Sequence, residues 1–319
     1  MDLTKAFLFP GQGSQAVGMA KALAERFPQA RALLDEVDDA LGQRLSALMF
    51  EGPLDELTLT ANAQPALMAA SLAAIRVLEA EAGLELKRDA AFVAGHSLGE
   101  YSALAAAGSI SVADAARLLR LRGKAMQAAA PVGVGAMAAL LGVEAEAARD
   151  IASQAAAESG ADAVCEVAND NGGGQTVVSG STDAVNRAID IAKSKGARRA
   201  ILLPVSAPFH CALMQPAAKV MSAALADVAI APPVAPLVAN VLAAPVSDPE
   251  EIRRLLVAQV TGAVRWRESL LFMAGTGVSL FVECGAGKVL SGLIKRVCAD
   301  AAGISVGTPD DIAAYKALA

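Results

Sequence analysis

The sequence has 319 residues, of which 55% are hydrophobic, 19% charged and 3% aromatic, and its formal net charge is −6. A chain of this length buries a sizeable core, and its acidic balance and scarce aromatics argue against nucleic acids or anionic membranes as partners. The four cysteines show no CxxC spacing, so we expect no metal site, no disulfide framework and a cytoplasmic location.

Two uncharged stretches, 200–218 and 228–247, approach the length of a membrane span. Both contain several prolines and polar residues, which interrupt a transmembrane helix, so we interpret them as buried strands and turns. Only a short apolar run precedes Pro10, and we therefore expect no signal peptide.

The first hundred residues alternate between short apolar runs and alanine-rich segments. We expect strands at 6–9 and 90–94, helices from the first strand to about residue 81, and a further helix that ends near Gly108. Short buried strands that alternate with helices form parallel sheets, so this pattern predicts an α/β domain. A late strand is expected at 280–283.

The segment 133–204 has a different order of expected elements. Strand, helix, strand, strand, helix and strand are predicted in turn at 135–142, 144–158, 164–168, 176–179, 182–195 and 199–205. This βαββαβ order is ferredoxin-like. We therefore predict a small domain at 133–204, inserted into a larger domain formed by 1–132 and 205–319.

A candidate nucleophile lies in the segment 95–99, which reads Gly-His-Ser-Leu-Gly. The G-x-S-x-G pattern between a strand and a helix places its serine, here Ser97, on a sharp turn with the hydroxyl exposed. The backbone N–H of Leu98 opens the helix and is expected to face an oxyanion beside the serine.

The chain contains two histidines that a serine nucleophile can use as its base. His96 adjoins Ser97, and neighbouring side chains diverge on a tight turn, so His96 is poorly placed to reach the hydroxyl. His210 follows a predicted strand in a later loop, which is the usual order in nucleophile-elbow enzymes. The alternative is a buried, hydrogen-bonded core histidine.

An arginine interrupts the apolar face of the helix that is predicted to begin near Ser111. At 100° per residue, Arg122 falls in the middle of the apolar face. A buried guanidinium needs a partner, and its planar fork suits a carboxylate. The partner is either an Asp or Glu of the protein or the free acid of a substrate, such as a malonyl group.

The loop after the first strand, 10–15, has two interpretations. Its glycines approximate a dinucleotide-binding fingerprint, but that motif needs a second strand where 31–41 is predicted to be helical. The better interpretation is a loop whose backbone N–H groups face the site and supply a second oxyanion donor.

These motifs together resemble the bacterial malonyl-CoA:acyl carrier protein transacylase family, which is related to polyketide acyltransferase domains. The matching segments occur in family order at 9–15, 64–66, 95–101, 122, 208–210, 281–283 and 287–290. The resemblance implies a hydrolase-like α/β core with a parallel sheet and a nucleophile elbow, plus an inserted ferredoxin-like small domain.

The resemblance also implies roles for individual residues. The expected site consists of Ser97 as nucleophile, His210 as base, Gln12 and Leu98 as backbone oxyanion donors, Arg122 as malonyl carboxylate clamp, Gln259 as the residue whose carbonyl orients the histidine, and Gln64 as a pocket residue. Phe209, beside the base, is hypothesised to limit substituents on the α-carbon of the acyl donor.

The implied activity is ping-pong transfer of malonyl from malonyl-CoA to the phosphopantetheine thiol of acyl carrier protein, supplying fatty acid synthesis. No cofactor is expected, because phosphopantetheine belongs to the partner, and a monomer is expected from the family. The carrier protein is expected to dock on a basic cluster, either 193–199 or Lys288 with Lys295 and Arg296. The alternatives are a polyketide-pathway acyltransferase, a serine thioesterase or hydrolase, and a non-enzymatic docking protein.

Overall fold

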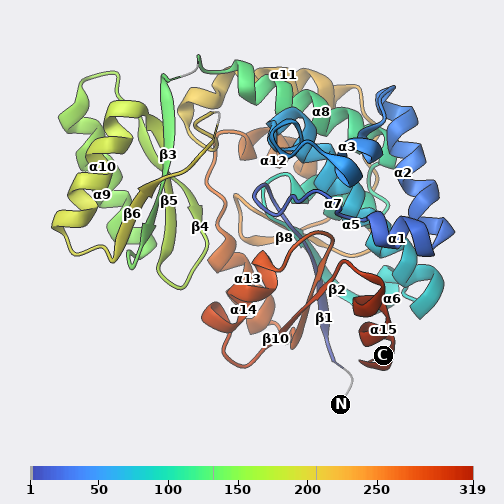
Figure 1. Cartoon of the computed structure of the whole chain (residues 1–319). Helices are drawn as coiled ribbons and strands as arrows, with labels where there is room; N and C mark the ends of the chain where they lie inside the picture. Colours follow the sequence, from blue (N-terminus) through green and yellow to red (C-terminus); the bar gives the residue numbers. More distant parts are fainter. Residues whose placement is uncertain (1–2, 132, 206, 319) are drawn as a thin grey trace.

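The computed structural model describes residues 3–131, 133–205 and 207–318. Val132, where we expect the first segment of the larger domain to end, and both chain termini lie outside this part. The described residues form one sheet of six strands and one of four. Figure 1 shows the two sheets side by side, with the smaller one on the left.

The larger sheet is formed by β1 (Lys5–Phe9), β2 (Ala90–Gly95), β7 (Leu237–Ala239), β8 (Ala244–Val246), β9 (Leu280–Cys284) and β10 (Ala302–Val306). Its strand order is β10-β9-β1-β2-β7-β8. Neighbouring strands are parallel from β10 to β7, and β8 at the edge is antiparallel to β7. The predicted α/β architecture is confirmed.

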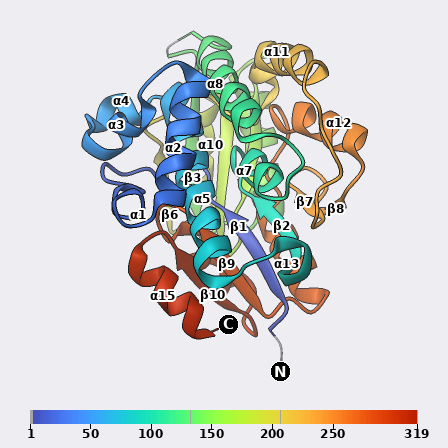
Figure 2. The same cartoon turned by 90° about the vertical axis from the view of Figure 1, so that its right-hand side faces the viewer.

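Helices cover both faces of this sheet, as the turned view in Figure 2 shows. Outside the small sheet they are α1 (Lys21–Arg26), α2 (Pro28–Leu41), α3 (Leu45–Glu51), α4 (Leu54–Thr58), α5 (Thr60–Ala82), α6 (Leu86–Asp89), α7 (Gly99–Ala106), α8 (Val112–Ala128), the 3₁₀ turn η1 (Ala212–Met214), α11 (Gln215–Ala226), α12 (Pro249–Gln259), α13 (Trp266–Gly275), α14 (Val289–Val297) and α15 (Pro309–Leu318). None of the described helices is both long and apolar enough to cross a membrane.

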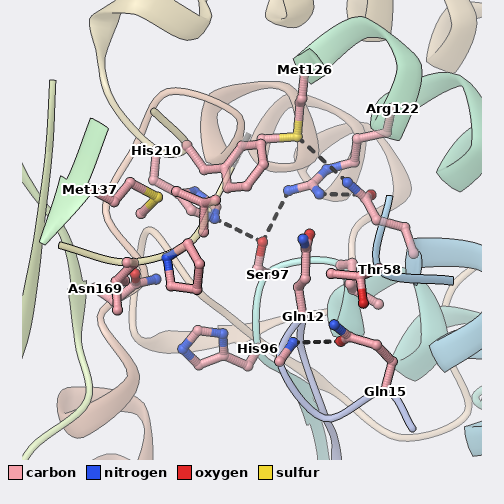
Figure 3. Close-up of a pocket in the computed structure, with 17 residues that line it drawn as sticks. Gln12, Gln15, Thr58, His96, Ser97, Arg122, Met126, Met137, Asn169 and His210 are labelled. Carbon is pink, nitrogen blue, oxygen red and sulfur yellow. Dashed lines mark hydrogen bonds between the residues drawn. The ribbon is translucent and has the colours of Figure 1, made fainter. Parts of the chain in front are cut away.

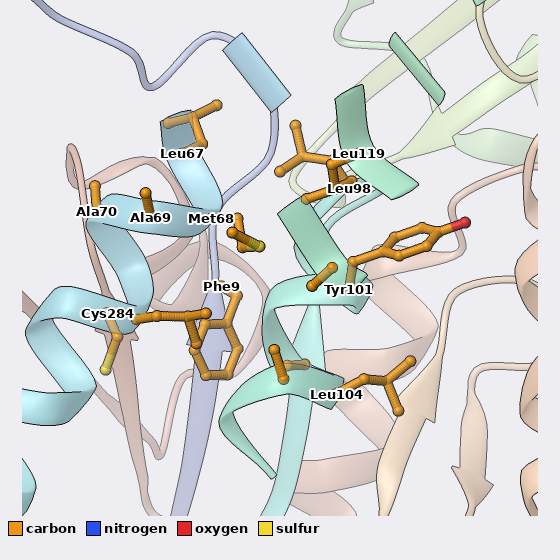
Figure 4. Packing of buried hydrophobic residues seen from close by; sticks show 14 of the residues in the cluster. Phe9, Leu67, Met68, Ala69, Ala70, Leu98, Tyr101, Leu104, Leu119 and Cys284 are labelled. Carbon is orange, nitrogen blue, oxygen red and sulfur yellow. The ribbon is translucent and has the colours of Figure 1, made fainter. Parts of the chain in front are cut away.

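Strand β1 shows how the sequence builds two cores. Successive strand residues point to opposite faces. Phe7 and Phe9 therefore belong to one core cluster, with residues of α2, α5, α7 and α8, while Ala6 and Leu8 belong to another, with residues of α13 and α14. Figure 4 shows Phe9 surrounded by residues of the first of these cores. A strand buried on both faces reads as a continuous apolar run, which is why β1 is recognisable in the sequence.

The smaller sheet contains β3 (Gly135–Leu141), β4 (Cys165–Asp170), β5 (Gln175–Ser181) and β6 (Arg199–Leu202), with α9 (Ala145–Ser159) and α10 (Thr182–Ser194) between them. All its pairings are antiparallel, in the order β4-β5-β3-β6. The chain order is the predicted βαββαβ. The limits of the two domains stay a prediction.

Three strands of the larger sheet were not placed individually by the sequence. Strands β7 and β8 lie within the uncharged stretch 228–247, which we interpreted only as strands and turns. Strand β10 was not predicted, because its Ala-Gly-Ile-Ser-Val sequence is short and mixed. It exists because each of its residues pairs in register with β9.

A hairpin of the small sheet joins the two parts of the molecule. The end of β4 forms an isolated parallel bridge between Asn169 and Val264, just before α13. The Asp170 carboxylate lies 2.9 Å from Nε of Arg267, and the Asn171 side chain lies 2.9 Å from Nε2 of His96. The small sheet is therefore fixed beside the elbow that carries Ser97.

Candidate active site

The turn between β2 and α7 holds Ser97 in a left-handed conformation, with φ of 54°. Such a φ is strained for a residue with a Cβ, and it persists only where the surroundings enforce it. A Cβ on Gly95 would lie 1.8 Å from the carbonyl carbon of Gly99, and a Cβ on Gly99 would lie 2.2 Å from the Phe9 oxygen. Glycine at both positions lets the strand and helix approach this closely.

The Ser97 hydroxyl is hydrogen bonded to His210, although 113 residues separate them, with 2.7 Å between Oγ and Nε2 (Figure 3). Nδ1 of His210 lies 2.9 Å from the carbonyl oxygen of Gln259 and 3.1 Å from that of Gly262. Carbonyl oxygens only accept, so Nδ1 carries the proton and Nε2 is free to accept the serine proton.

The environment of His210 keeps its imidazole neutral. Burial lowers its pKa to about 3, and the nearby positive charge of Arg122 acts in the same direction. The carbonyl acceptors of Gln259 and Gly262 oppose this shift, because they favour the protonated ring. A neutral imidazole is the form that accepts a proton from serine.

Arg122 is buried, with 1% of its surface exposed, and points at the serine. Its Nη1 donates to Gln64 Oε1 at 2.9 Å, and its Nη2 donates to Gln259 Oε1 at 2.7 Å and to Ser97 Oγ at 3.2 Å. Gly123 permits the close crossing of α8 and α5 that brings this arginine beside Gln64, since a Cβ there would lie 2.6 Å from Ala61 Cα.

No carboxylate of the described residues forms an ion pair with Arg122, and its Nε has no hydrogen-bond partner among them. The alternative of a salt bridge to a protein Asp or Glu is therefore not found there. A buried guanidinium is costly when no carboxylate of the described residues lies at ion-pair distance, and a substrate carboxylate would supply one.

Two backbone N–H groups at the cavity are free to hold an oxyanion. Among the described residues, the N–H groups of Gln12 and Leu98 have no hydrogen-bond partner, and both residues line the cavity. The Ser97 N–H, by contrast, donates to Asn240 Oδ1 at 2.8 Å and is occupied. An oxyanion hole needs two unpaired backbone donors, and this role of Gln12 and Leu98 stays a prediction.

The cavity at the serine has a volume of about 350 Å³ and is lined from both parts of the chain. Gln12, Gln64, Ser97, Leu98, Arg122, Phe209 and His210 line it. Met126 of α8 and Met137 of β3 add apolar surface, as Figure 3 shows. The structure thus gathers seven of the eight sequence-predicted site residues around one space, and Gln259 reaches it through hydrogen bonds.

Three residues of the site carry no local sequence signal, namely Asn240, Glu100 and Gly262. Asn240 holds the elbow, because it accepts from the Ser97 N–H and donates to the Gly95 carbonyl at 2.7 Å. Glu100 lies in the family-matching segment 95–101, but its hydrogen-bond partners Asn240 and Gln259 are 140 and 159 residues away in the chain. Gly262 adds the second carbonyl on His210. No local sequence pattern reports such long-range pairs.

A serine on a nucleophile elbow, a neutral imidazole and paired backbone donors define the class of acyl-transferring α/β enzymes. Consistent with that class, residues 6–308 match the family described as Acyl transferase domain. The malonyl CoA-acyl carrier protein transacylase of Bacillus subtilis strain 168 is 45% identical over 96% of this chain and 94% of its own length. The chain belongs to the family of malonyl CoA-acyl carrier protein transacylases.

Solved structures agree with this assignment. The acyl-carrier-protein S-malonyltransferase of Bartonella henselae is 55% identical, with a TM-score of 0.96 over 99% of each chain. A malonyl-transacylase solved in complex with a type II PKS acyl-carrier protein is 40% identical, with a TM-score of 0.94 over 99% of this chain and 100% of its own.

Proposed function

We propose that this chain transfers a malonyl group from malonyl-CoA to the phosphopantetheine thiol of an acyl carrier protein, through an ester on Ser97. The proposal is carried by one observation: Ser97, His210 and Arg122 converge on one cavity, and Arg122 forms no ion pair with any described residue. The serine and histidine account for acyl transfer, and the arginine accounts for an acyl group that carries a free carboxylate.

In the first half-reaction His210 Nε2 accepts the Ser97 proton while Oγ attacks the thioester carbonyl. The N–H groups of Gln12 and Leu98 hold the oxyanion, and Arg122 holds the malonyl carboxylate. The carbon–sulfur bond then breaks, and His210 returns its proton to the departing thiolate, so that free CoA leaves.

The second half-reaction runs the same steps with a different thiol. The phosphopantetheine thiol gives its proton to His210 and attacks the serine ester. The intermediate collapses with the proton returning to Ser97 Oγ, which releases the malonyl-carrier thioester. The chain's own residues supply each proton transfer, so the proposed reaction uses no cofactor beyond the pantetheine that the partner carries.

The pathway follows from the identity of the carrier protein, and we propose a carrier of fatty acid synthesis. A polyketide-pathway carrier is the alternative, favoured by the relative solved with such a partner. Transfer rates to purified carriers of both kinds would separate the two, since the chemistry at Ser97 is the same in each.

We propose that the carrier docks over Lys288, Lys295 and Arg296, at the two ends of α14. These cations are exposed, and none has a salt bridge among the described residues. Three apolar residues of α14, Val289, Leu290 and Leu293, line a second cavity that shares Gln12 and His96 with the active-site cavity. The cluster thus flanks a route to the serine.

The test is intact-mass analysis after brief exposure to malonyl-CoA or acetyl-CoA. The wild-type chain should gain one malonyl group, and Ser97→Ala should gain none. Arg122→Ala should acquire malonyl at least ~10-fold more slowly because it loses a charged hydrogen-bond partner, while acetyl acquisition changes less.

Surface Arg117, on the exposed side of the same helix, supplies the matched control, and Arg117→Ala should behave as wild type. A malonyl adduct on Ser97→Ala would exclude Ser97 as the nucleophile. Equal losses of malonyl and acetyl in Arg122→Ala would exclude the carboxylate clamp.

A further inference from the structure

Glu100 is a buried carboxylate that the reaction above does not use. It lies in the first turn of α7, three residues after the nucleophile, with 1% of its surface exposed. Oε1 accepts from the Asn240 backbone N–H at 2.5 Å, and Oε2 accepts from Nε2 of Gln259 in a short hydrogen bond. Burial raises the pKa of Glu100 to about 8, and its N–H donors and Arg122 oppose that rise.

The side-chain amide of Gln259 stands between Glu100 and the reacting groups. Its Nε2 also donates to the Ser97 carbonyl oxygen at 2.8 Å, and its Oε1 accepts from Arg122 Nη2 at 2.7 Å. Its backbone carbonyl accepts from His210 Nδ1. One residue therefore contacts the nucleophile's backbone, the arginine and the base.

This amide fits its surroundings in one orientation only. A flipped amide would turn its NH₂ toward the Arg122 guanidinium, which can only donate, and its oxygen toward two other acceptors. Above its pKa, Glu100 is the charged acceptor that favours the observed orientation. Without it, the preference rests on the Ser97 carbonyl and the guanidinium alone.

We propose that Glu100 is a positioning residue for malonyl specificity, which holds the Gln259 amide so that Arg122 is aimed at the substrate carboxylate. The proposal rests on the proposed function, because it concerns how the clamp of that site is oriented. A carboxylate is needed at this position, since two N–H donors from different elements require two acceptor oxygens. Glutamine offers one acceptor and would set its own NH₂ against one of the donors.

The chain offers a matched control in Glu283. This glutamate is also fully buried, and its two oxygens also accept two N–H groups, from Leu290 at 3.1 Å and Ser291 at 2.8 Å, at the start of α14. Glu283→Gln removes an acceptor from the same kind of arrangement, and among the described residues the hydrogen bonds of Glu283 do not involve Gln259 or Arg122.

The experiment compares kcat/KM for malonyl-CoA and acetyl-CoA at pH 8.5, above the pKa of Glu100. Glu100→Gln should lower the malonyl-to-acetyl ratio by about tenfold, the scale of one charged hydrogen bond, mainly through a higher KM for malonyl-CoA. Glu283→Gln should lower the thermal midpoint and leave the ratio within about twofold. Glu100→Asp, with its oxygens withdrawn by one methylene, should reproduce the loss if Glu100→Gln does not fold.

A double-mutant cycle tests whether Glu100 acts through Gln259. In a Gln259→Met background, which lacks the amide, Glu100→Gln should cause no further fall in the ratio. A wild-type ratio in the Glu100 variants, or an undiminished fall in the Gln259→Met background, would overturn the proposal. The proposed function fails separately, if the wild-type chain forms no malonyl ester.

Discussion

The two histidines show how surroundings assign different roles to one residue type. His96 is turned away from the serine next to it, with Nε2 2.9 Å from Asn171 Oδ1 and its ring edge-on to Trp266 at 5.5 Å between centroids. His210, 113 residues from the serine, contacts its hydroxyl. Sequence adjacency therefore says little about which imidazole reaches a nucleophile.

The lowered pKa of His210 predicts an unusual pH dependence. Since the ring stays neutral down to about pH 3, acylation of Ser97 at saturating malonyl-CoA, where the effect of Glu100 on KM does not enter, should change less than about twofold between pH 8 and pH 5. Single-turnover rates measured by rapid quench would check this. A loss of half the rate near pH 6.5, the ordinary value for histidine, would contradict it.

The lowered pKa of His210 also makes the free energy of unfolding depend on pH. In the unfolded chain His210 binds a proton near its ordinary pKa, while the folded chain does not bind it until far lower pH. The contribution of His210 to the free energy of unfolding should therefore fall as the pH drops below about 6.5, while the raised pKa of Glu100 contributes in the opposite direction. Thermal midpoints recorded alongside the rates distinguish unfolding from protonation of the base.

At the residue scale, the sequence predicts the site roles of some side chains and not of others. Arg122 is visible because a charge interrupts an apolar helical face, and Ser97 because a glycine pattern surrounds it. The Gln259 carbonyl was expected only from the family resemblance. Glu100 and Asn240 were not predicted, because their contacts depend on how β7 and α12 lie beside the elbow.

At the scale of elements, the β2–α7 elbow requires glycine at position 95, because a methyl group there would collide with the helix. Gly95→Ala would drive a Cβ to 1.8 Å from the backbone of Gly99, and neither backbone can move without shifting β2 or α7. Such overpacking should cost about 3 kcal/mol or more of unfolding free energy, or prevent folding. Urea denaturation followed by circular dichroism would measure the loss.

The control is a glycine-to-alanine substitution at a position where an added methyl group meets no crowding. Gly292 lies inside α14, and no atom of the described residues beyond its immediate surroundings in the helix would lie within 4 Å of an added Cβ. Gly292→Ala should be neutral or stabilise by about 0.5–1 kcal/mol, because alanine has the higher helix propensity. Equal losses in the two variants would show that crowding at the elbow is not what requires glycine.

The elements themselves were predictable where the chain is buried on both faces or strongly periodic. Strands β1 and β2, and the βαββαβ order of the small sheet, follow from apolar runs and helical spacing. Strand β6 ends at Leu202, three residues before the predicted end, because its register with β3 ends there and, among the described residues, only one further backbone bond to that strand, from Leu203 N–H to the Met137 carbonyl, follows. Strand β10 owes its existence to β9, which no local pattern records.

For the whole molecule, the active site depends on both sheets being held together. Met137 of the small sheet and Met126 of the large domain line the same cavity. The contacts of Asp170 with Arg267 and of Asn171 with His96 hold the small sheet at a fixed distance from the large domain. Shape and specificity of the cavity are therefore properties of the assembled molecule.

The distribution of charge over the whole molecule predicts a salt effect on one substrate only. The net charge is −6, and carrier proteins are usually acidic, so attraction must come from a local cluster. Raising salt from about 50 to 500 mM should lower kcat/KM for holo-carrier protein roughly tenfold, and leave transfer to uncharged pantetheine nearly unchanged.

Charge-reversal variants test which cluster is responsible. The double variant Lys288→Glu/Lys295→Glu should lower kcat/KM for the carrier at low salt, and the control Lys193→Glu/Lys195→Glu, in the other exposed cluster, should not. Salt-insensitive transfer to the carrier, or equal effects of the two charge reversals, would contradict docking over α14.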